Sequence, residues 1–189
     1  MGSIKKELLS GVFYTAIAKY SGILISLIIT GVLARLISPD KFGIVAVVTV
    51  ITFFFSIFSD LGIGAAIIQN KELQQKDLNQ LFSFTVWSGC ILTLLFFLCS
   101  WPISFFYKEP SMRTITQLLA INLFFASANI VPNALLYKAK AFKFLAWRSL
   151  GVQVSGGIIA ILAALDGAGL YALIINPILS SILLFIISY

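Results

Sequence analysis

The sequence has 189 residues, of which 60% are hydrophobic and 11% are charged, with a mean hydropathy of +1.04 and a formal net charge of +6. Soluble domains contain about 25% charged residues, and a globule of this length leaves about a third of its extended-chain surface in water. The composition therefore excludes the soluble globular and disordered classes, and we expect lipid to surround most of the chain.

Six long hydrophobic runs are separated by short polar breaks, at residues 11–37, 42–59, 81–106, 114–136, 147–165 and 170–189. A helix needs about 20 mostly apolar residues to cross about 30 Å of hydrocarbon. Unpaired backbone groups are too costly in lipid for any spanning structure except a helix or a closed barrel, and these runs lack the alternation of barrel strands. The sequence predicts an all-α, polytopic membrane bundle of about six transmembrane helices, with residues 1–189 as one membrane domain.

Residues typical of helix ends occupy the polar breaks. Ser38-Pro39-Asp40 offers a capping serine, a proline at the first helical position and an acid in the first turn, which predicts a tight hairpin between the first two helices. We expect Asp77 to cap the third helix and Ser111 the fourth, and residues 166–169 (Asp-Gly-Ala-Gly) to form the last turn.

Two prolines fall inside hydrophobic runs rather than between them. Pro132 predicts a kink in the fourth helix. The pair Asn176-Pro177 predicts a break in the sixth helix, where a freed carbonyl would need a partner.

Lysine and arginine are unevenly divided between the two sets of helix ends. The end that includes the N-terminus carries Lys5, Lys6, Lys71, Lys76, Lys138, Lys140, Lys143 and Arg148. The opposite end carries Arg35, Lys41, Lys108 and Arg113. Positive charge in short loops favours the cytoplasmic side, so we expect a multi-pass protein of the bacterial inner membrane with a cytoplasmic N-terminus. The positive net charge then reflects orientation and contact with anionic lipids, and we expect no nucleic-acid partner.

The segment from Lys138 to Arg148 (KAKAFKFLAWR) interleaves cations with aromatic residues. Such a pattern is typical of an amphipathic stretch that lies on an anionic leaflet, and we expect it to do so without a special ligand.

Lys19 is a charged residue inside the first hydrophobic run. A lysine at the bilayer centre costs about 2.5–3.5 kcal/mol, whereas each of the eight Leu, Ile and Val residues between Ile23 and Leu33 returns about 0.3–0.6 kcal/mol, so the helix can still insert. Two interpretations stay open: Lys19 lines a cavity, or it reaches the inner headgroups while the helix packs through small residues. Lys19 shares one helix face with small and polar residues: Gly11, Thr15, Gly22, Ser26 and Thr30.

Amides concentrate on one face of the fourth helix, at Asn122, Asn129 and Asn133, with Ala126 between them. Lipid would penalise such a face. The fifth helix carries a close-packing seam of small residues with one polar member, Gln153. Several helices with one polar face each can surround a hydrated cavity that accepts an amphiphile, which favours transport over anchoring.

Enzyme signatures are missing from the sequence. It contains no histidine, no phosphate loop, no GxSxG, no metal-ligand spacing and no pair of carboxylates on one helix face. Cys90 and Cys99 point to opposite faces of a helix and cannot form a disulfide. We therefore expect no enzymatic activity, no metal and no cofactor.

Two segments resemble a known family. Residues 34–69 contain ARLISPDKFG and SDLGIGAAIIQ, and residues 129–149 read NIVPNALLYKAKAFKFLAWRS. These segments resemble the Wzx-type polysaccharide flippases, in the polysaccharide-transport branch of the multidrug/oligosaccharidyl-lipid/polysaccharide exporter superfamily. The resemblance implies two helical bundles around a cationic cavity, of which this chain supplies the first. We therefore expect it to be a fragment of a longer protein.

The resemblance also implies an activity: translocation of an undecaprenyl-diphosphate-linked oligosaccharide across the inner membrane by alternating access, for lipopolysaccharide or exopolysaccharide synthesis. It implies a cationic substrate site at Lys19, where this family commonly has arginine, and other polysaccharide-assembly proteins as partners. We expect the cavity to be lined by Lys19, Thr15, Ser26, Asn122 and Asn129.

Two further residues each have two possible roles. Arg35 either receives the head group on release or anchors the helix at the interface. Asp60 is either a proton or cation site for coupling or a helix-end cap. Two other functions also stay open: a drug or lipid exporter of the same superfamily, and a non-transporting membrane scaffold whose polar stripes are packing seams.

Overall fold

The computed structural model describes the backbone of residues 2–60, 62–70 and 72–189, and the side chains in those ranges from Gly11 onward except that of Val12. Over these residues the chain is helical, and none of them lies in a strand. The helices in chain order are α1 (Gly2–Leu36), α2 (Pro39–Asp60), α3 (Ile63–Gln69), α4 (Gln75–Tyr107), α5 (Pro110–Ala128), α6 (Ile130–Lys138), α7 (Phe142–Leu165) and α8 (Leu170–Ser188).

Six segments within the described ranges are long and apolar enough to cross a membrane, which confirms the all-α, polytopic bundle. Their bounds are Phe13–Leu36, Pro39–Gln69, Gln75–Tyr107, Pro110–Lys138, Phe142–Leu165 and Leu170–Ser188. The second span covers α2 and α3 on either side of Leu61, which lies outside the described residues, and the fourth covers α5 and α6. The first and sixth spans are slightly shorter than the predicted runs. The third, fourth and fifth are longer by a turn or two, because polar end turns continue a helix without adding hydrophobicity, and the second is longer because it includes α3.

The helix ends follow local chemistry, with one correction. Pro39 is the first residue of α2, as predicted. Asp77 does cap α4, from the third helical position, where its carboxylate accepts a 3.0 Å bond from the backbone N–H of Gln74. The prediction for Ser111 was wrong: the cap of α5 is Glu109, whose carboxylate accepts from the backbone N–H of Ser111 over 3.4 Å. Glu109 takes this place because the helix already begins at Pro110.

The fourth span is broken at Asn129, between α5 and α6, three residues before Pro132. This position agrees with the predicted kink, since proline disturbs the preceding turn. The predicted break at Asn176-Pro177 was wrong, because α8 runs unbroken from Leu170 to Ser188. The Asn176 amide lies against α7, where a Cβ on Gly156 would come within 2.5 Å of its Oδ1, and packing of this kind lets a membrane helix tolerate an internal proline.

The stretch from Lys138 to Arg148, predicted to lie on an anionic leaflet, is helical in most of its length. Its first residue, Lys138, closes α6, and Phe142 to Arg148 form the first two turns of α7. Its contact with the leaflet stays a prediction.

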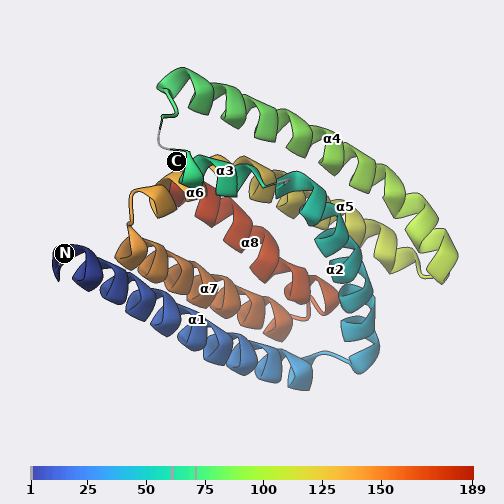
Figure 1. Ribbon diagram of the computed structural model, residues 1–189. Helices are drawn as coiled ribbons and strands as arrows, with labels where there is room; N and C mark the ends of the chain where they lie inside the picture. The colour runs from blue at the N-terminus through green and yellow to red at the C-terminus, as the bar shows by residue number, and fades with distance from the viewer. Residues whose placement is uncertain (1, 61, 71) are drawn as a thin grey trace.

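Figure 1 shows α4 beside α5 at one side of the bundle and α1 beside α7 at the other, with α8 between the two pairs. Successive spans run antiparallel, whereas α1 and α7 run parallel because both begin at the same end of the bundle. The N-terminus, α3, the link from α6 to α7 and the C-terminal end of α8 gather at one end of the bundle (Figure 1). We call this the N-terminal end. The main core lies among α2, α4, α5 and α8, around Phe96, Ile115 and Leu123.

Glycines set the close approach of the helix pairs. A Cβ on Gly157 in α7 would overlap the side chain of Ile29 in α1, and a Cβ on Gly89 in α4 would lie 2.7 Å from Cβ of Ser127 in α5. These positions act as small-residue packing seams, because without a hydrophobic force between helices in lipid, close van der Waals contact holds a bundle together.

Candidate functional site

A basic pocket of about 330 Å³ opens among α1, α6, α7 and the end of α8. We use the name basic pocket because Lys19 of α1 and Arg148 of α7 both line it, and its described lining residues include no carboxylate. Asn133 and Tyr137 of α6 and Thr15 of α1 complete its polar wall. Lys19 is exposed and Arg148 is half-buried. Two cations with no carboxylate among the described lining residues favour an anionic ligand.

Arg148 is the most constrained of these side chains. Its Nη2 donates a 2.8 Å hydrogen bond to Oδ1 of Asn133, and its Nη1 donates to the hydroxyl of Ser188 in α8. Its Nε is buried and has no hydrogen-bond partner among the described residues. The guanidinium therefore ties α7 to α6 and α8, and its positive charge lies at the wall of the basic pocket.

The polar stripe of α1 serves two purposes. Its glycines pack on α7: a Cβ on Gly11 would lie 2.6 Å from the Phe142 ring, and the backbone carbonyl of Gly22 accepts a 2.9 Å bond from Nε2 of Gln153. Thr15 and Lys19 instead line the basic pocket. The glycines of this face therefore pack on α7, while Lys19 borders a cavity and is exposed, so that its reach to the inner headgroups stays an open alternative.

A second pocket, of about 420 Å³, lies between the ends of α2 and α3 and the helices α5 and α6. We call it the polar pocket, because Asp60, Ser56 and Asn133 line it together with Tyr137. Asp60 is exposed, and its Oδ1 accepts a 3.4 Å bond from the backbone N–H of Gly64 in the first turn of α3. The Asp60 carboxylate thus contacts the first turn of α3 and also borders a cavity, and its two alternatives stay open.

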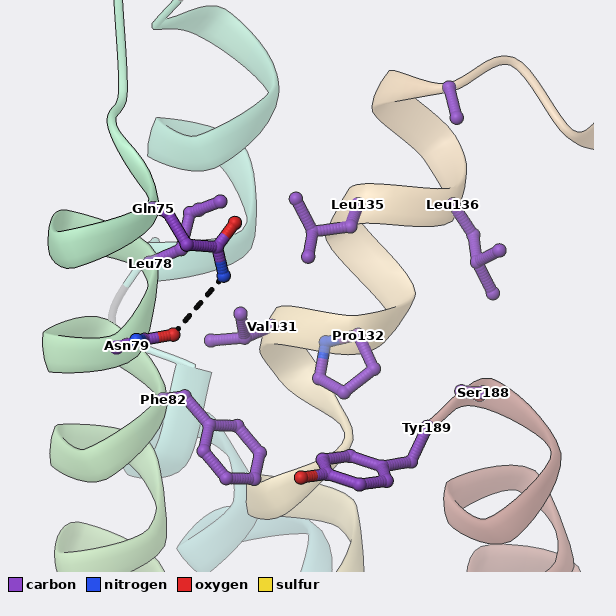
Figure 2. A pocket seen from close by; sticks show the side chains of 11 residues that line it. Gln75, Leu78, Asn79, Phe82, Val131, Pro132, Leu135, Leu136, Ser188 and Tyr189 are labelled. Carbon is purple, nitrogen blue, oxygen red and sulfur yellow. Dashed lines mark hydrogen bonds between the residues drawn. The ribbon is translucent and has the colours of Figure 1, made fainter.

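A third pocket, of about 470 Å³, lies on the other side of α6, between α6, the start of α4 and the end of α8. Figure 2 shows Phe82 and Tyr189 pointing toward one another across it, with rings 5.9 Å apart, and Gln75 bonded to Asn79 at its polar rim. We call it the apolar pocket, since Val131, Leu135 and other hydrocarbon side chains form most of its wall. All three pockets are lined by α6, at the N-terminal end of the bundle.

The remaining candidates from the sequence lie elsewhere. Ser26, Asn122 and Asn129 line none of these three pockets. Ser26 is exposed on α1, Asn122 is half-buried in α5, and Asn129 lies at the break between α5 and α6, where its Oδ1 is buried without a partner among the described residues. Arg35 is exposed at the far end of α1, so its two alternatives stay open.

Sequence reasoning missed the central residue, Arg148. It was counted only among the orienting charges, because the fifth helix was expected to begin at Trp147. A signal was present: Arg148 lies four residues before Val152 and eight before Gly156, on the buried face of α7. Tyr137 carried no comparable signal, since a tyrosine near the end of a span is typical of the membrane interface.

Within the described part of the chain, no group of three or more His, Cys, Asp or Glu side chains lies together in a way that could hold a metal ion. Cys90 and Cys99 are free thiols.

Comparison with known proteins gives consistent matches. A family described as "Polysaccharide biosynthesis protein" matches residues 32–189. The chain is 27% identical over 158 residues to the lipopolysaccharide biosynthesis protein WzxC of Escherichia coli (strain K12), a match that covers 84% of this chain and 31% of that protein. It is 28% identical over 121 residues to the teichuronic acid biosynthesis protein TuaB of Bacillus subtilis (strain 168), covering 64% and 25%.

A further relative is the succinoglycan biosynthesis transport protein ExoT of Rhizobium meliloti (strain 1021), 22% identical over 151 residues that cover 80% of this chain and 31% of that protein. The chain thus spans between a quarter and a third of the length of these relatives. No solved structure matches it at a significant level.

Proposed function

The chain belongs to the polysaccharide biosynthesis protein family, and from that premise we propose that it forms part of a flippase for a lipid-linked oligosaccharide. The proposed substrate is an undecaprenyl-diphosphate-linked oligosaccharide, moved across the bacterial inner membrane for surface polysaccharide synthesis. The proposal is one of transport without covalent chemistry. The names of WzxC and ExoT, one a lipopolysaccharide biosynthesis protein and one a transport protein, support it.

The observation that carries this proposal is the basic pocket. A diphosphate cannot enter hydrocarbon without compensation, because an unpaired anion in a low-dielectric medium costs many kcal/mol. Lys19 and Arg148 supply two positive charges from different helices at one site, with no described carboxylate among the lining residues to neutralise them. In this pocket, Lys19 and Arg148 would replace the water molecules that hydrate the diphosphate in solution.

The apolar pocket supports an amphiphilic substrate. Ser188 lines the apolar pocket and accepts a bond from Arg148, which lines the basic pocket, so the two pockets meet at the end of α8. A polyprenyl chain can remain in lipid or along such an apolar wall while its diphosphate lies at the cations. This arrangement suits a ligand with one charged and one hydrocarbon end.

The charge distribution supports a cytoplasmic N-terminus. In that orientation the three pockets lie at the cytoplasmic end of the bundle, where a lipid-linked precursor would load. We further propose contacts with anionic inner-leaflet lipids and with other polysaccharide-assembly proteins, which would supply and receive the substrate.

The test is complementation of a strain that lacks its own flippase, with the complete gene product. We expect Lys19→Ala and Arg148→Ala to abolish surface polysaccharide while the protein still reaches the membrane fraction. Lys143→Ala is the matched control, since Lys143 is an exposed cation in the first turn of α7 and lines none of the three pockets. Wild-type polysaccharide in both pocket variants would contradict the proposed site.

A further inference from the structure

We infer that the polar pocket is the subsite for the first sugar of the lipid-linked oligosaccharide, and that Asp60, Asn133 and Tyr137 determine which sugar is accepted. This inference rests on the proposed function and goes beyond it, because it assigns substrate specificity to a different cavity from the one that holds the diphosphate.

The first argument is the adjacency of the two pockets. Asn133 and Tyr137 line both the basic pocket and the polar pocket, so these two side chains form the wall between them. In a lipid-linked oligosaccharide the first sugar is bonded directly to the diphosphate. A diphosphate between Lys19 and Arg148 therefore brings that sugar to Asn133 and Tyr137, at the edge of the polar pocket.

The second argument is the set of hydrogen-bonding groups in the polar pocket. Sugar hydroxyls both donate and accept, and they are recognised by a few fixed groups of both kinds. The Asp60 carboxylate is a pure acceptor, and the cap contact from the Gly64 N–H to its Oδ1, at 3.4 Å, is long. The Asn133 amide has its oxygen committed to Arg148 at 2.8 Å, so its NH₂ group is the donor that the amide can offer to a ligand.

The third argument is the ring of Tyr137. Its side chain is 40% exposed although it borders two cavities, and the ring of Phe142 in α7 packs edge-on to it at 6.5 Å between centroids. Phe142 in turn fills the space that Gly11 of α1 leaves open, with ring atoms 2.6 Å from where a Cβ on that glycine would lie. The phenol is thus supported from behind, and its electron-rich face can pack on the C–H face of a pyranose ring.

Asn133 connects binding of the diphosphate with recognition of the sugar, because it lines both pockets and bonds Arg148 of α7. Arg148 orients the Asn133 amide, and the NH₂ group of that amide would donate to a sugar hydroxyl. A bound ligand that lacks the matching hydroxyl covers the amide or carboxylate without pairing it, which is the mechanism by which polar sites reject close analogues.

The test compares two probes on the purified complete gene product in nanodiscs of bacterial lipid: undecaprenyl diphosphate alone and undecaprenyl diphosphate bearing one sugar. The quantity of interest is the ratio of their affinities. We expect Asp60→Asn to lower the affinity for the glycosylated probe about tenfold or more and to leave that for undecaprenyl diphosphate unchanged. Tyr137 also lines the basic pocket, so we expect Tyr137→Ala to lower the affinity for the glycosylated probe more than that for undecaprenyl diphosphate. Tyr137→Phe keeps the ring and should retain part of the sugar preference.

Matched controls lie at the opposite end of the bundle. Asp166→Asn and Tyr171→Ala alter an exposed acid and an exposed tyrosine there, and should leave both affinities unchanged. An unchanged affinity ratio in Asp60→Asn and Tyr137→Ala would overturn the sugar subsite. So would an equal loss for both probes, which would indicate a general role of Asp60 such as coupling.

Failure of the proposed function has a different signature. A wild-type protein that binds neither probe, or Lys19→Ala and Arg148→Ala variants that bind undecaprenyl diphosphate as well as wild type, would contradict the flippase site itself. The sugar subsite is tested separately, because only the difference between the two probes reports on it.

Discussion

The guanidinium of Arg148 donates from Nη2 to the side-chain oxygen of Asn133 over 2.8 Å, and this bond joins α7 to α6 at the junction of two cavities. Both residues face the basic pocket, yet they come from spans separated in sequence by a turn and a helix end. The bond holds the guanidinium of Arg148 at the basic pocket, which Lys19 also lines, rather than toward lipid. Membrane helices rarely carry such a cation without a functional reason.

Replacement of Arg148 by lysine tests whether binding needs the planar set of guanidinium donors or only the positive charge. Lysine keeps the charge but cannot bond Asn133, Ser188 and a ligand in one planar arrangement. We expect Arg148→Lys to weaken binding of undecaprenyl diphosphate by about tenfold, as expected for loss of a charge-assisted hydrogen bond. The measurement is the dissociation constant for that lipid in nanodiscs.

Arg113→Lys is the matched control for this change. Arg113 lies in α5, with its guanidinium carbon 4.5 Å from the centre of the Trp101 ring, and lines none of the three pockets. If both arginine-to-lysine changes altered the dissociation constant for undecaprenyl diphosphate equally, the guanidinium geometry of Arg148 would have no special role in binding.

The seam between α1 and α7 predicts an asymmetry between two glycines of the same helix. A Cβ on Gly157 would overlap Ile29, whereas a Cβ on Gly151 would meet nothing within 4 Å. We expect Gly157→Ala to lower the melting temperature in detergent, as overpacking of about 1–3 kcal/mol does. Gly151→Ala should be neutral or slightly stabilising, because alanine favours a helix. Equal melting temperatures would contradict the packing seam.

Two buried threonine hydroxyls predict opposite outcomes of the same substitution. Thr93 Oγ1 in α4 is buried without a hydrogen-bond partner among the described residues, whereas Thr116 Oγ1 in α5 donates to the carbonyl of Met112 over 2.7 Å. An unpaired buried hydroxyl costs about 1–3 kcal/mol. Thr93→Val should therefore raise the melting temperature, and Thr116→Val should leave it unchanged or lower it. A gain from both changes would show that the hydroxyls are equivalent.

The orientation of the bundle can be checked by cysteine labelling. With Cys90 and Cys99 replaced by alanine, Ser38→Cys at one end should react with a membrane-impermeant maleimide from outside the inner membrane. Gln74→Cys, before α4 at the N-terminal end, should react only after that membrane is permeabilised, because the lysine-rich end is expected to face the cytoplasm. The reverse pattern would place the basic pocket on the outer side.

Local pattern predicted much of the fold. The six spans, the proline start of α2 and the kink before Pro132 follow from hydropathy and from residues that favour helix ends, which act over a few neighbouring positions. The errors had two different sources. Ser111 lost the cap position to Glu109 because the helix starts two residues earlier than a Ser111 cap would place it. Asn176 packs on Gly156 of the neighbouring α7 in place of breaking α8, which is a tertiary contact.

The site was predicted only in part, for a different reason. Thr15 and Lys19 line the basic pocket, but Ser26 of the same face lies outside it, since a straight α1 carries successive members of one face farther along the bundle. Asn129 and Asn133 share a face in sequence, yet only Asn133 reaches the pockets, because the chain breaks at Asn129. Helix periodicity gives no information about which neighbour a face meets.

The composition of 60% hydrophobic and 11% charged residues determined that lipid is the solvent, and the length and pattern of the hydrophobic runs determined that the structure is helical, with six segments able to cross a membrane. These properties depend on the length and polarity of single segments. Only the tertiary structure decided that Lys19, Arg148 and Asn133 border one cavity, with Tyr137 and Asp60 beside it. Such a meeting depends on how each helix rotates about its axis and crosses its neighbours, which close contacts such as those at Gly11 and Gly157 determine in three dimensions.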